Sequence, residues 1–195
     1  MSSNFQNEKE DPRITRTRQL ILQAFMELLS EKGFQSMTVQ DITERAGINR
    51  ATFYDRFTDK YALLDYSISQ TFRQEIEKYM LDACHYSDEN LHALIIMVCE
   101  FVSKAIAHCK PANPQFESLM ETQIKNQLQE LLQVWLEQEE SSVDSKTAAI
   151  AASWALYGLV LQWSHDKSKQ HPPAEKYADK IFPIIASSLR LAQPA

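Results

Sequence analysis

Glycine is scarce in this chain of 195 residues, which contains only Gly33, Gly47 and Gly158. Nucleotide-binding loops of the G-x-x-x-x-G-K-[ST] and G-x-G-x-x-G kinds need several glycines within a few residues, because their backbone approaches phosphate closely. The wide spacing of these three glycines excludes both loops. Few glycines, combined with long stretches in which apolar residues recur with a period near 3.6, predict an all-α fold.

Cysteine is also scarce, and no cysteine has a close histidine or cysteine partner with metal-ligand spacing. Cys84, Cys99 and Cys109 are odd in number and follow no apparent signal peptide, so reduced thiols in the cytoplasm are expected. His92 and Cys99 share a helix face, but their spacing places them about 10 Å apart, too far for one metal ion. We therefore expect no metal and no other cofactor.

A recognisable catalytic set is missing as well. Ser164, His165 and Asp166 are adjacent in the sequence, but consecutive side chains at a helix end project in different directions. The chain contains no nucleophile elbow of the G-x-S-x-G kind. Together with the missing phosphate-binding loops, this makes a small helical enzyme the least favoured function.

Long uncharged runs are limited to Thr147–Ser164. The length of this run would suit a membrane span, but the run includes Thr, Ser, Gln, Tyr and Gly, and no basic cluster flanks it. We interpret it as a buried helix. A composition of 44% apolar and 24% charged residues agrees with a globular protein.

Positive charge is not in excess, since the formal net charge is −6. Residues 1–66 contain nine Lys and Arg against ten Asp and Glu, whereas residues 67–195 contain eleven against sixteen. The acidic excess therefore lies mainly in the second part. Nucleic-acid binding by the first part would depend on a few positioned cations and hydroxyls rather than on a general basic surface.

What the chain does contain is a helix-turn-helix pattern between Thr38 and Lys60, TVQDITERAGINRATFYDRFTDK. Thr38 stands at an N-cap position, followed by an amphipathic helix. Gly47 can adopt the left-handed conformation that ends this helix, and Asn49 can cap the next one. The sequence thus predicts two short helices joined by a tight turn.

The second of these helices has an apolar side and a polar side. Phe53 and Phe57 are four residues apart and are expected to face the core. The remaining arc carries small, hydroxyl and guanidinium groups, which suit the major groove of DNA. An ordinary three-helix core would contain a similar A-G-I turn, so the pattern alone leaves both interpretations open.

The same stretch resembles the DNA-binding signature of the TetR (tetracycline repressor) family of transcriptional regulators, and the resemblance covers residues 15–75. The matching residues are Thr38, Ala46, Gly47, Ile48, Asn49, Thr52, Tyr54, Phe57, Lys60 and Leu63 or Leu64. Two positions depart from the family pattern. Ala51 stands where the family often has Gly, and Arg56 stands where it often has His or Tyr, which would add a fixed cation.

The resemblance implies a homodimeric, ligand-responsive transcriptional regulator, expected to be a repressor that a small molecule releases from a palindromic operator. It also implies about nine helices. We expect a disordered tail at residues 1–12, a DNA-binding domain at residues 13–75 with its helix-turn-helix at 38–57, and a ligand-binding and dimerisation domain at residues 76–195. A ligand-binding or scaffold protein that does not bind an operator would keep the same fold.

The expected DNA contacts follow from the match to the family. Arg50 is predicted to read a base edge, because it combines a groove-facing position with a bidentate fork. Thr52, Tyr54 and Lys60 are predicted to hold phosphates, with Arg56 as a further candidate. The DNA-binding candidates are Thr38, Asn49, Arg50, Ala51, Thr52, Tyr54, Arg56 and Lys60.

The first helix precedes this stretch and opens with Arg13, Arg16 and Arg18, which either contact DNA or remain solvated. Gly33 is expected to end it. Its predicted apolar face consists of Leu20, Ile21, Ala24, Phe25, Leu28 and Leu29.

The helix after the helix-turn-helix is expected to be capped by Asp59 and to link the two domains. Further helices are predicted at about 88–109, 115–138, 145–164 and 174–191, with Asp88 as a candidate cap, a loop at 110–114 and a kink at Pro183.

The second domain supplies the remaining candidates. Phe101, Trp135 and Tyr157 are the expected walls of a pocket for an apolar or aromatic molecule. The resemblance places the last two helices in a dimer interface, to which we assign Trp154, Tyr157, Gly158 and Ile181. Core packing within one subunit would give a similar pattern of small and aromatic residues.

Overall fold

The structure, a computed structural model, describes residues 11–79, 85–108, 114–138, 144–166 and 172–190. Within these ranges the chain forms eight α-helices and no strand, which confirms the all-α prediction with one helix fewer than the nine expected. The chain divides into two compact units, residues 1–64 and 65–195. The division lies earlier than the expected domain boundary after residue 75.

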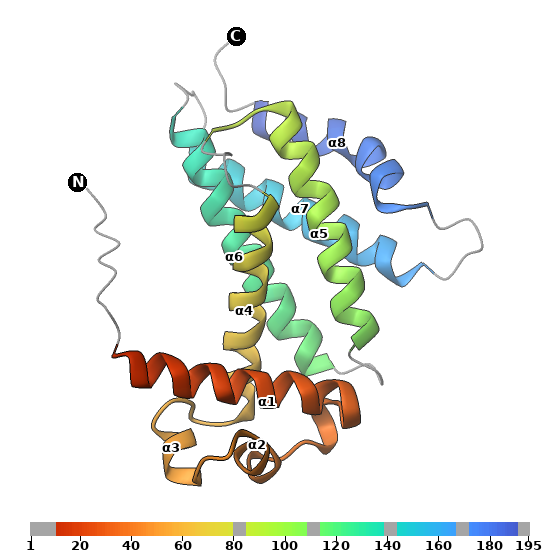
Figure 1. Ribbon diagram of the computed structural model, residues 1–195. Coiled ribbons are helices and arrows are strands. Elements are labelled where there is room, and N and C mark those ends of the chain that lie inside the picture. Colours follow the sequence, from red (N-terminus) through yellow and green to blue (C-terminus); the bar gives the residue numbers. More distant parts are fainter. Residues whose placement is uncertain (1–10, 80–84, 109–113, 139–143, 167–171, 191–195) are drawn as a thin grey trace. The chain divides into compact units, whose positions relative to one another are not determined.

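The first unit consists of three helices and the beginning of a fourth. These are α1 (Pro12–Ser36), α2 (Val39–Ala46), α3 (Arg50–Tyr54) and the first turn of α4 (Lys60–Tyr79). Helix α2 packs against both α1 and α3 (Figure 1). The centre of the core of this unit is formed by fully buried side chains from all four helices: Ile21, Phe25, Ile42, Phe53 and Leu63.

Helix α1 departs from ideal geometry near its end, as its sequence predicts. Gly33 has φ 73° and ψ 163°, so the backbone leaves the helical conformation there before a last short turn reaches Ser36. The predicted apolar face is buried except for Leu20, which is 41% exposed. The expectation for Leu20 was wrong, because this residue lies on the edge of the helix face that packs on the core.

The predicted caps of the two short helices are confirmed. Thr38 forms a capping box with Asp41: its Oγ1 accepts from the Asp41 N–H at 3.2 Å, and its own N–H donates to Asp41 Oδ2 at 2.7 Å. Gly47 ends α2 in the left-handed conformation, with φ 67° and ψ 34°. Asn49 Oδ1 accepts from the Thr52 N–H at 2.7 Å and caps α3.

Helix α3 is shorter than predicted, since it ends at Tyr54. The Phe57 N–H still donates to the Phe53 carbonyl at 2.9 Å, so the two rings keep their expected relation. Their centroids lie 5.9 Å apart, and both side chains are buried. These two rings attach the turn after α3 to the core of the unit.

The second unit contains the rest of α4 together with α5 (Asp88–His108), α6 (Pro114–Glu137), α7 (Ser145–His165) and α8 (Ala174–Arg190). Helix α7 packs against α5, α6 and α8, and α5 also packs against α8 (Figure 1). Ala149, Ala152 and Leu156 of α7 are fully buried. This confirms the interpretation of the uncharged run as a buried helix.

Helix α5 is, among the described residues, the one helix whose length and composition would also allow a membrane span, at Asp88–Ala107. Leu91, Leu94 and Ile95 of α5 are fully buried inside the second unit. Core helices of folded domains satisfy the same length and hydropathy criteria, so this observation is weak evidence for a membrane.

The larger part of α4 belongs to the second unit, where it forms hydrogen bonds with α6 and a ring contact with α5. Gln123 Nε2 donates to Asp65 Oδ1 at 2.8 Å, and Gln127 Nε2 donates to the Ser69 carbonyl at 3.1 Å. The Phe72 ring meets the Phe101 ring edge-on at 4.9 Å. These contacts explain why the division between the units falls before Asp65.

The N-terminal cap of α4 agrees with the prediction, whereas that of α5 differs from it by one residue. Asp59 caps α4 as predicted, since its Oδ1 accepts from the N–H groups of Tyr61 and Ala62, each at 2.8 Å. Asp88 does not cap α5. The cap is Ser87, whose Oγ accepts from the Asn90 N–H at 3.1 Å, and Asp88 is the first residue of the helix.

Candidate functional site

The exposed side of the helix-turn-helix is formed mainly by α3 and the residues that flank it. Arg50 and Ala51, in the first turn of α3, are exposed. Tyr54, one turn after Arg50, is 50% exposed, and its ring stands perpendicular to the Phe53 ring at 5.5 Å. Since Phe53 is fully buried, this contact fixes the Tyr54 ring at the surface. Arg50 and Tyr54 therefore lie on the same outward face.

The hydroxyl groups of the two candidate threonines are already used within the unit. Thr38 Oγ1 donates to Asp41 Oδ2 at 2.7 Å, and Thr52 Oγ1 donates to Asn49 Oδ1 at 2.9 Å. A hydroxyl has one proton, and phosphate oxygens only accept. In this arrangement Thr38 and Thr52 stabilise the helix caps, and a phosphate contact from either hydroxyl would require it to turn.

Arg56, the residue that departs from the family pattern, is folded back on its own backbone. Its Nη1 donates to the Asp55 carbonyl at 3.3 Å. Its Nε is buried and has no hydrogen-bond partner within the described ranges. This geometry differs from an extended guanidinium ready to bind phosphate.

Lys60 is turned into the unit rather than outwards. Its ammonium donates to the carbonyls of Phe34, Gln35 and Met37 at 3.1, 3.3 and 2.8 Å. Burial lowers the pKa of Lys60. The geometry does not support the phosphate contact that the resemblance implied for this residue.

Two further cations, which the sequence analysis did not single out, attach α2 to α1. Arg45 binds Glu31 through two hydrogen bonds of 2.8 and 2.7 Å and Glu27 at 3.2 Å. These bonds raise the pKa of Arg45. Lys32 lies 2.7 Å from Asp41, and this bond, with those from Thr38, holds the pKa of the Asp41 carboxyl well below its usual range. In the sequence, the i,i+4 spacing of Glu27 and Glu31 indicates two carboxylates on one face of α1, where a cation could bind both.

The three expected pocket residues of the second unit lie in or near its core. Trp135 is fully buried, and Tyr157 is 2% exposed. Phe101 is half-buried and packs on Phe72. The structure thus places two of these aromatic side chains in the core of one unit and the third, Phe101, at its edge, as a ligand pocket or an ordinary core would require.

Tyr157 has one property that an ordinary core residue lacks. Its hydroxyl is buried and has no hydrogen-bond partner among the described residues. Burial, together with the charges of Glu121 and Glu117, raises the pKa of Tyr157, so the hydroxyl keeps its proton. A buried polar group without a partner is uncommon in folded proteins and calls for a water or a ligand.

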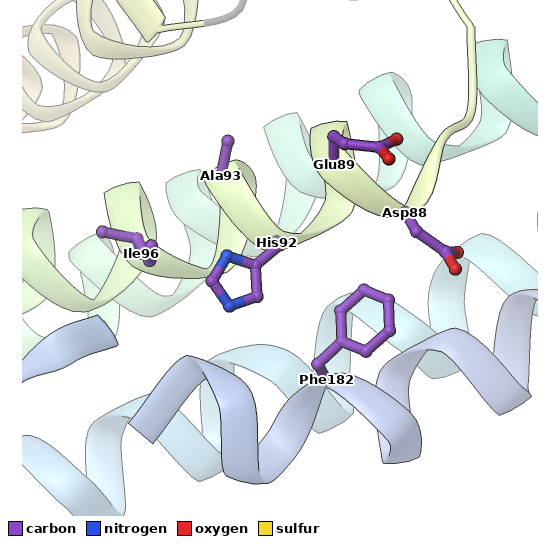
Figure 2. A pocket seen from close by; sticks show the side chains of 6 residues that line it. All are labelled: Asp88, Glu89, His92, Ala93, Ile96 and Phe182. Atoms are coloured by element: carbon purple, nitrogen blue, oxygen red, sulfur yellow. The ribbon is translucent and has the colours of Figure 1, made fainter. Parts of the chain in front are cut away.

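A groove lies elsewhere in this unit, between α5 and α8, with a volume of about 440 Å³. Figure 2 shows the Phe182 ring of α8 directed towards His92 and Asp88 of α5. His92 Nε2 lies 2.8 Å from Asp179 Oδ1, and the Tyr86 hydroxyl donates to Asp88 at 3.1 Å. None of the three expected pocket residues lines this groove.

Neither the groove nor the described part of the chain offers a metal centre. No group of three or more His, Cys, Asp or Glu among the described residues could hold an ion. Cys99 is buried, and burial raises the pKa of its thiol to about 12, so it is not a thiolate at neutral pH. Cys84 and Cys109 lie outside the described residues.

The four expected interface residues divide into two pairs. Tyr157 and Ile181 are each 2% exposed, so their side chains belong to the core of the subunit. Trp154 is 59% exposed, and Gly158 is exposed one turn later on α7. The ammonium of Lys125 lies 3.3 Å from the centroid of the Trp154 ring.

Comparison with known proteins agrees with this architecture. The family model "Bacterial regulatory proteins, tetR family" matches residues 21–66. The chain is 30% identical to YxbF of Bacillus subtilis, an uncharacterised HTH-type transcriptional regulator, over 86% of this chain and 45% of that protein. It is 29% identical to the HTH-type transcriptional regulator UidR of Escherichia coli over 51% and 50%. The chain thus spans half or less of the length of these curated relatives.

Solved structures resemble the whole described fold. A TetR-family regulator from Streptomyces coelicolor has a TM-score of 0.62 at 15% identity, over 92% of this chain and 98% of that chain. The Thermus thermophilus repressor FadR, solved with lauroyl-CoA, has a TM-score of 0.61 at 19% identity, over 91% and 97%. At such identities the similarity shows the fold alone.

The buried hydroxyl of Tyr157 leads to a prediction about the free energy of unfolding. Tyr157→Phe should raise the free energy of unfolding by about 1 kcal/mol, because it removes a buried polar group that no atom of the described residues satisfies. Tyr177→Phe is the matched control: the Tyr177 hydroxyl donates to the Leu159 carbonyl at 2.8 Å, and its loss should cost about 1 kcal/mol. Urea unfolding at one protein concentration measures both. Equal destabilisation by the two substitutions would mean that the Tyr157 hydroxyl has a partner in solution.

Proposed function

Because the chain belongs to the TetR family of bacterial regulatory proteins, we propose that it is a cytoplasmic transcriptional repressor that a small molecule releases from a palindromic operator. The observation that carries this proposal is the outward face of α3. This face presents Arg50 and Tyr54 from a helix whose other side is anchored by the fully buried Phe53.

The shape of this face suits a major groove. Ala51 adds no bulk beside Arg50, so the helix can approach the floor of the groove closely. Arg50 carries a planar fork that matches the O6 and N7 atoms of guanine, whereas Tyr54 can donate its hydroxyl to a phosphate. We assign base recognition to Arg50 and phosphate binding to Tyr54.

Substitution of Arg50 tests this assignment. Arg50→Ala should weaken operator binding by roughly 1–3 kcal/mol and relax the preference at one base pair, because a bidentate base contact is lost. Arg50→Lys, which keeps the charge but not the fork, should also relax that preference. Binding is measured by gel shift on the DNA that flanks the gene and on variants with single base-pair changes.

Two results of that experiment would count against the assignment or the function. An unchanged base preference in Arg50→Ala would exclude base recognition by Arg50. If the unaltered protein binds none of the DNA flanking its gene, the alternative of a ligand-binding or scaffold protein without operator binding gains support.

A dimer would supply the two helix-turn-helix units that a palindromic operator needs. We infer that its interface includes the exposed apolar face of α7, where Ile150, Trp154 and Gly158 follow one another at successive turns. Ile184 of α8 is 53% exposed, and α8 packs against α7. Large exposed apolar side chains next to small residues favour an interaction surface, and Trp is enriched at the centre of such surfaces.

Gly158 allows a clean test of the dimer. Apart from its chain neighbours and the backbone of its own helix, a Cβ added at Gly158 meets no atom within 4 Å, so Gly158→Arg should leave the subunit folded while placing a charge in the interface. We expect monomers by sedimentation and weaker DNA binding, whereas Gly158→Ala should remain dimeric. An unaltered protein that sediments as a monomer at micromolar concentration would contradict the proposal.

The effector is proposed to be an apolar or aromatic molecule bound among α4–α7, with the Tyr157 hydroxyl as its polar partner. The unpartnered hydroxyl supports this assignment, and FadR of the same fold was solved with lauroyl-CoA. Helix α4, which belongs to both units, is the proposed link through which the effector alters DNA binding. A ligand can weaken DNA binding only if it binds the DNA-incompetent conformation more tightly.

Thermodynamic reciprocity provides the test of this control. Titration calorimetry with lauroyl-CoA as the first probe should give an affinity about 5- to 150-fold weaker in the presence of operator DNA, matching the factor by which lauroyl-CoA weakens operator binding. If lauroyl-CoA binds with the same affinity in both conditions, its site does not control DNA binding.

A further inference from the structure

Lys60 connects the two ends of the helix-turn-helix, because it follows the segment and bonds to the residue that precedes it. Met37 immediately precedes Thr38, the cap of α2, and Lys60 is the first residue of α4. The Lys60 ammonium donates to the Met37 carbonyl at 2.8 Å, and so it closes the segment 38–59 into a loop held at its base. Two more bonds, to the carbonyls of Phe34 and Gln35 at 3.1 and 3.3 Å, attach the same ammonium to the end of α1.

The chemistry of this end of α1 explains the need for a cation. The backbone leaves the helical conformation at Gly33, so the carbonyls that follow no longer accept from a continuing helix. The Phe34 carbonyl accepts one long backbone bond, of 3.4 Å, from the Met37 N–H. A lysine has three N–H donors, and here three carbonyls accept from them. The ammonium also lies 4.7 Å from the centroid of the Phe34 ring and 5.7 Å from that of Tyr61.

Electrostatics favours the same role. A cation at the N-terminus of α4 opposes the helix dipole, whereas a cation at the C-terminus of α1 complements it. Because the ammonium points at the α1 carbonyls, the favourable interaction compensates the unfavourable one. A phosphate contact would forfeit at least one of the three carbonyl bonds.

We propose that Lys60 is a positioning residue for DNA binding, an internal cap that fixes α2 and α4 to the end of α1, and that it does not bind phosphate. This inference rests on the proposed function, since DNA binding is the activity that it positions. Helix α4 continues into the second unit. A shift of its first turn therefore acts through the Lys60 cap directly on the residue before α2.

The test compares Lys60→Met, which keeps an unbranched apolar stem but removes all three donors, with Lys60→Arg, which keeps the charge. Duplex DNA from the region flanking the gene is titrated at several salt concentrations and at a temperature where circular dichroism shows folded protein. Both variants should bind DNA roughly tenfold more weakly, because methionine has no donor and a planar guanidinium cannot reproduce the three carbonyl bonds. The salt dependence of binding should stay that of the unaltered protein. Amide exchange at residues 37–39 should become about tenfold faster.

Lys32→Met is the matched control, because it removes another lysine that bonds across the same unit, to Asp41. Lys32 is more exposed, so its loss should change affinity by about twofold or less. If Lys60→Met unfolds the unit, Lys60→Arg carries the comparison.

Two results would overturn the proposal. The first is a change in the slope of log affinity against log salt concentration: if Lys60 binds phosphate, this slope falls by about 0.9 in Lys60→Met and is restored in Lys60→Arg. The second is unchanged DNA affinity in folded Lys60→Met, which would show that Lys60 contributes to stability but does not position the DNA-binding helices. If the unaltered protein binds no duplex DNA, the proposed function fails instead, and the amide exchange still decides whether the cap forms.

Discussion

Hydrogen bonding of the free backbone groups at helix ends is the constraint on which the DNA-binding unit depends. Helix α2 has eight residues and α3 has five, lengths at which an isolated helix is unstable in water. In helices this short, at least half of the N–H and C=O groups lack an intrahelical partner. The caps at Thr38 and Asn49 supply partners for N–H groups of α2 and α3. Asp59 does the same at the start of α4, and the Lys60 ammonium binds carbonyls at the end of α1. The orientation of the exposed face of α3 follows from these bonds and from the burial of Phe53.

In the second unit, the main constraint is that α7 packs against three other helices and still has an exposed face. Helix α7 does so with small residues: Ala149 and Ala152 let its neighbours approach closely, and Trp154 remains outside. Among its larger side chains, Tyr157 introduces into the core a hydroxyl that has no hydrogen-bond partner in the described part of the chain. The unit thereby combines a packed interior, a buried hydroxyl that the described residues leave unsatisfied, and an exposed apolar stripe. The proposals about effector and dimer depend on these features.

The sequence was informative where the chemistry is local. A cap needs a short polar side chain at one position, and a left-handed helix end needs glycine, so Thr38, Gly47 and Asn49 could be assigned from their neighbours alone. Where two residues compete for a local role, the same reasoning failed, as it did when Ser87 rather than Asp88 proved to cap α5. The all-α fold and the buried character of α7 followed from periodicity and composition, which do not depend on the details of packing.

By itself, then, the sequence determined the helices, the turn at Gly47, the apolar side of α3 and the likeness of residues 15–75 to one family. Only the tertiary structure decided the direction of each side chain, because a direction depends on groups far away in the sequence. Lys60 illustrates the difference: its position next to α3 predicted a phosphate contact, but its acceptors are carbonyls of residues 34–37. Tyr157 and Ile181 were likewise expected in an interface, and the packing of the second unit turns both into its core instead. Helical periodicity gives the face on which a residue lies, whereas the partner of that face is set by the packing of the whole chain.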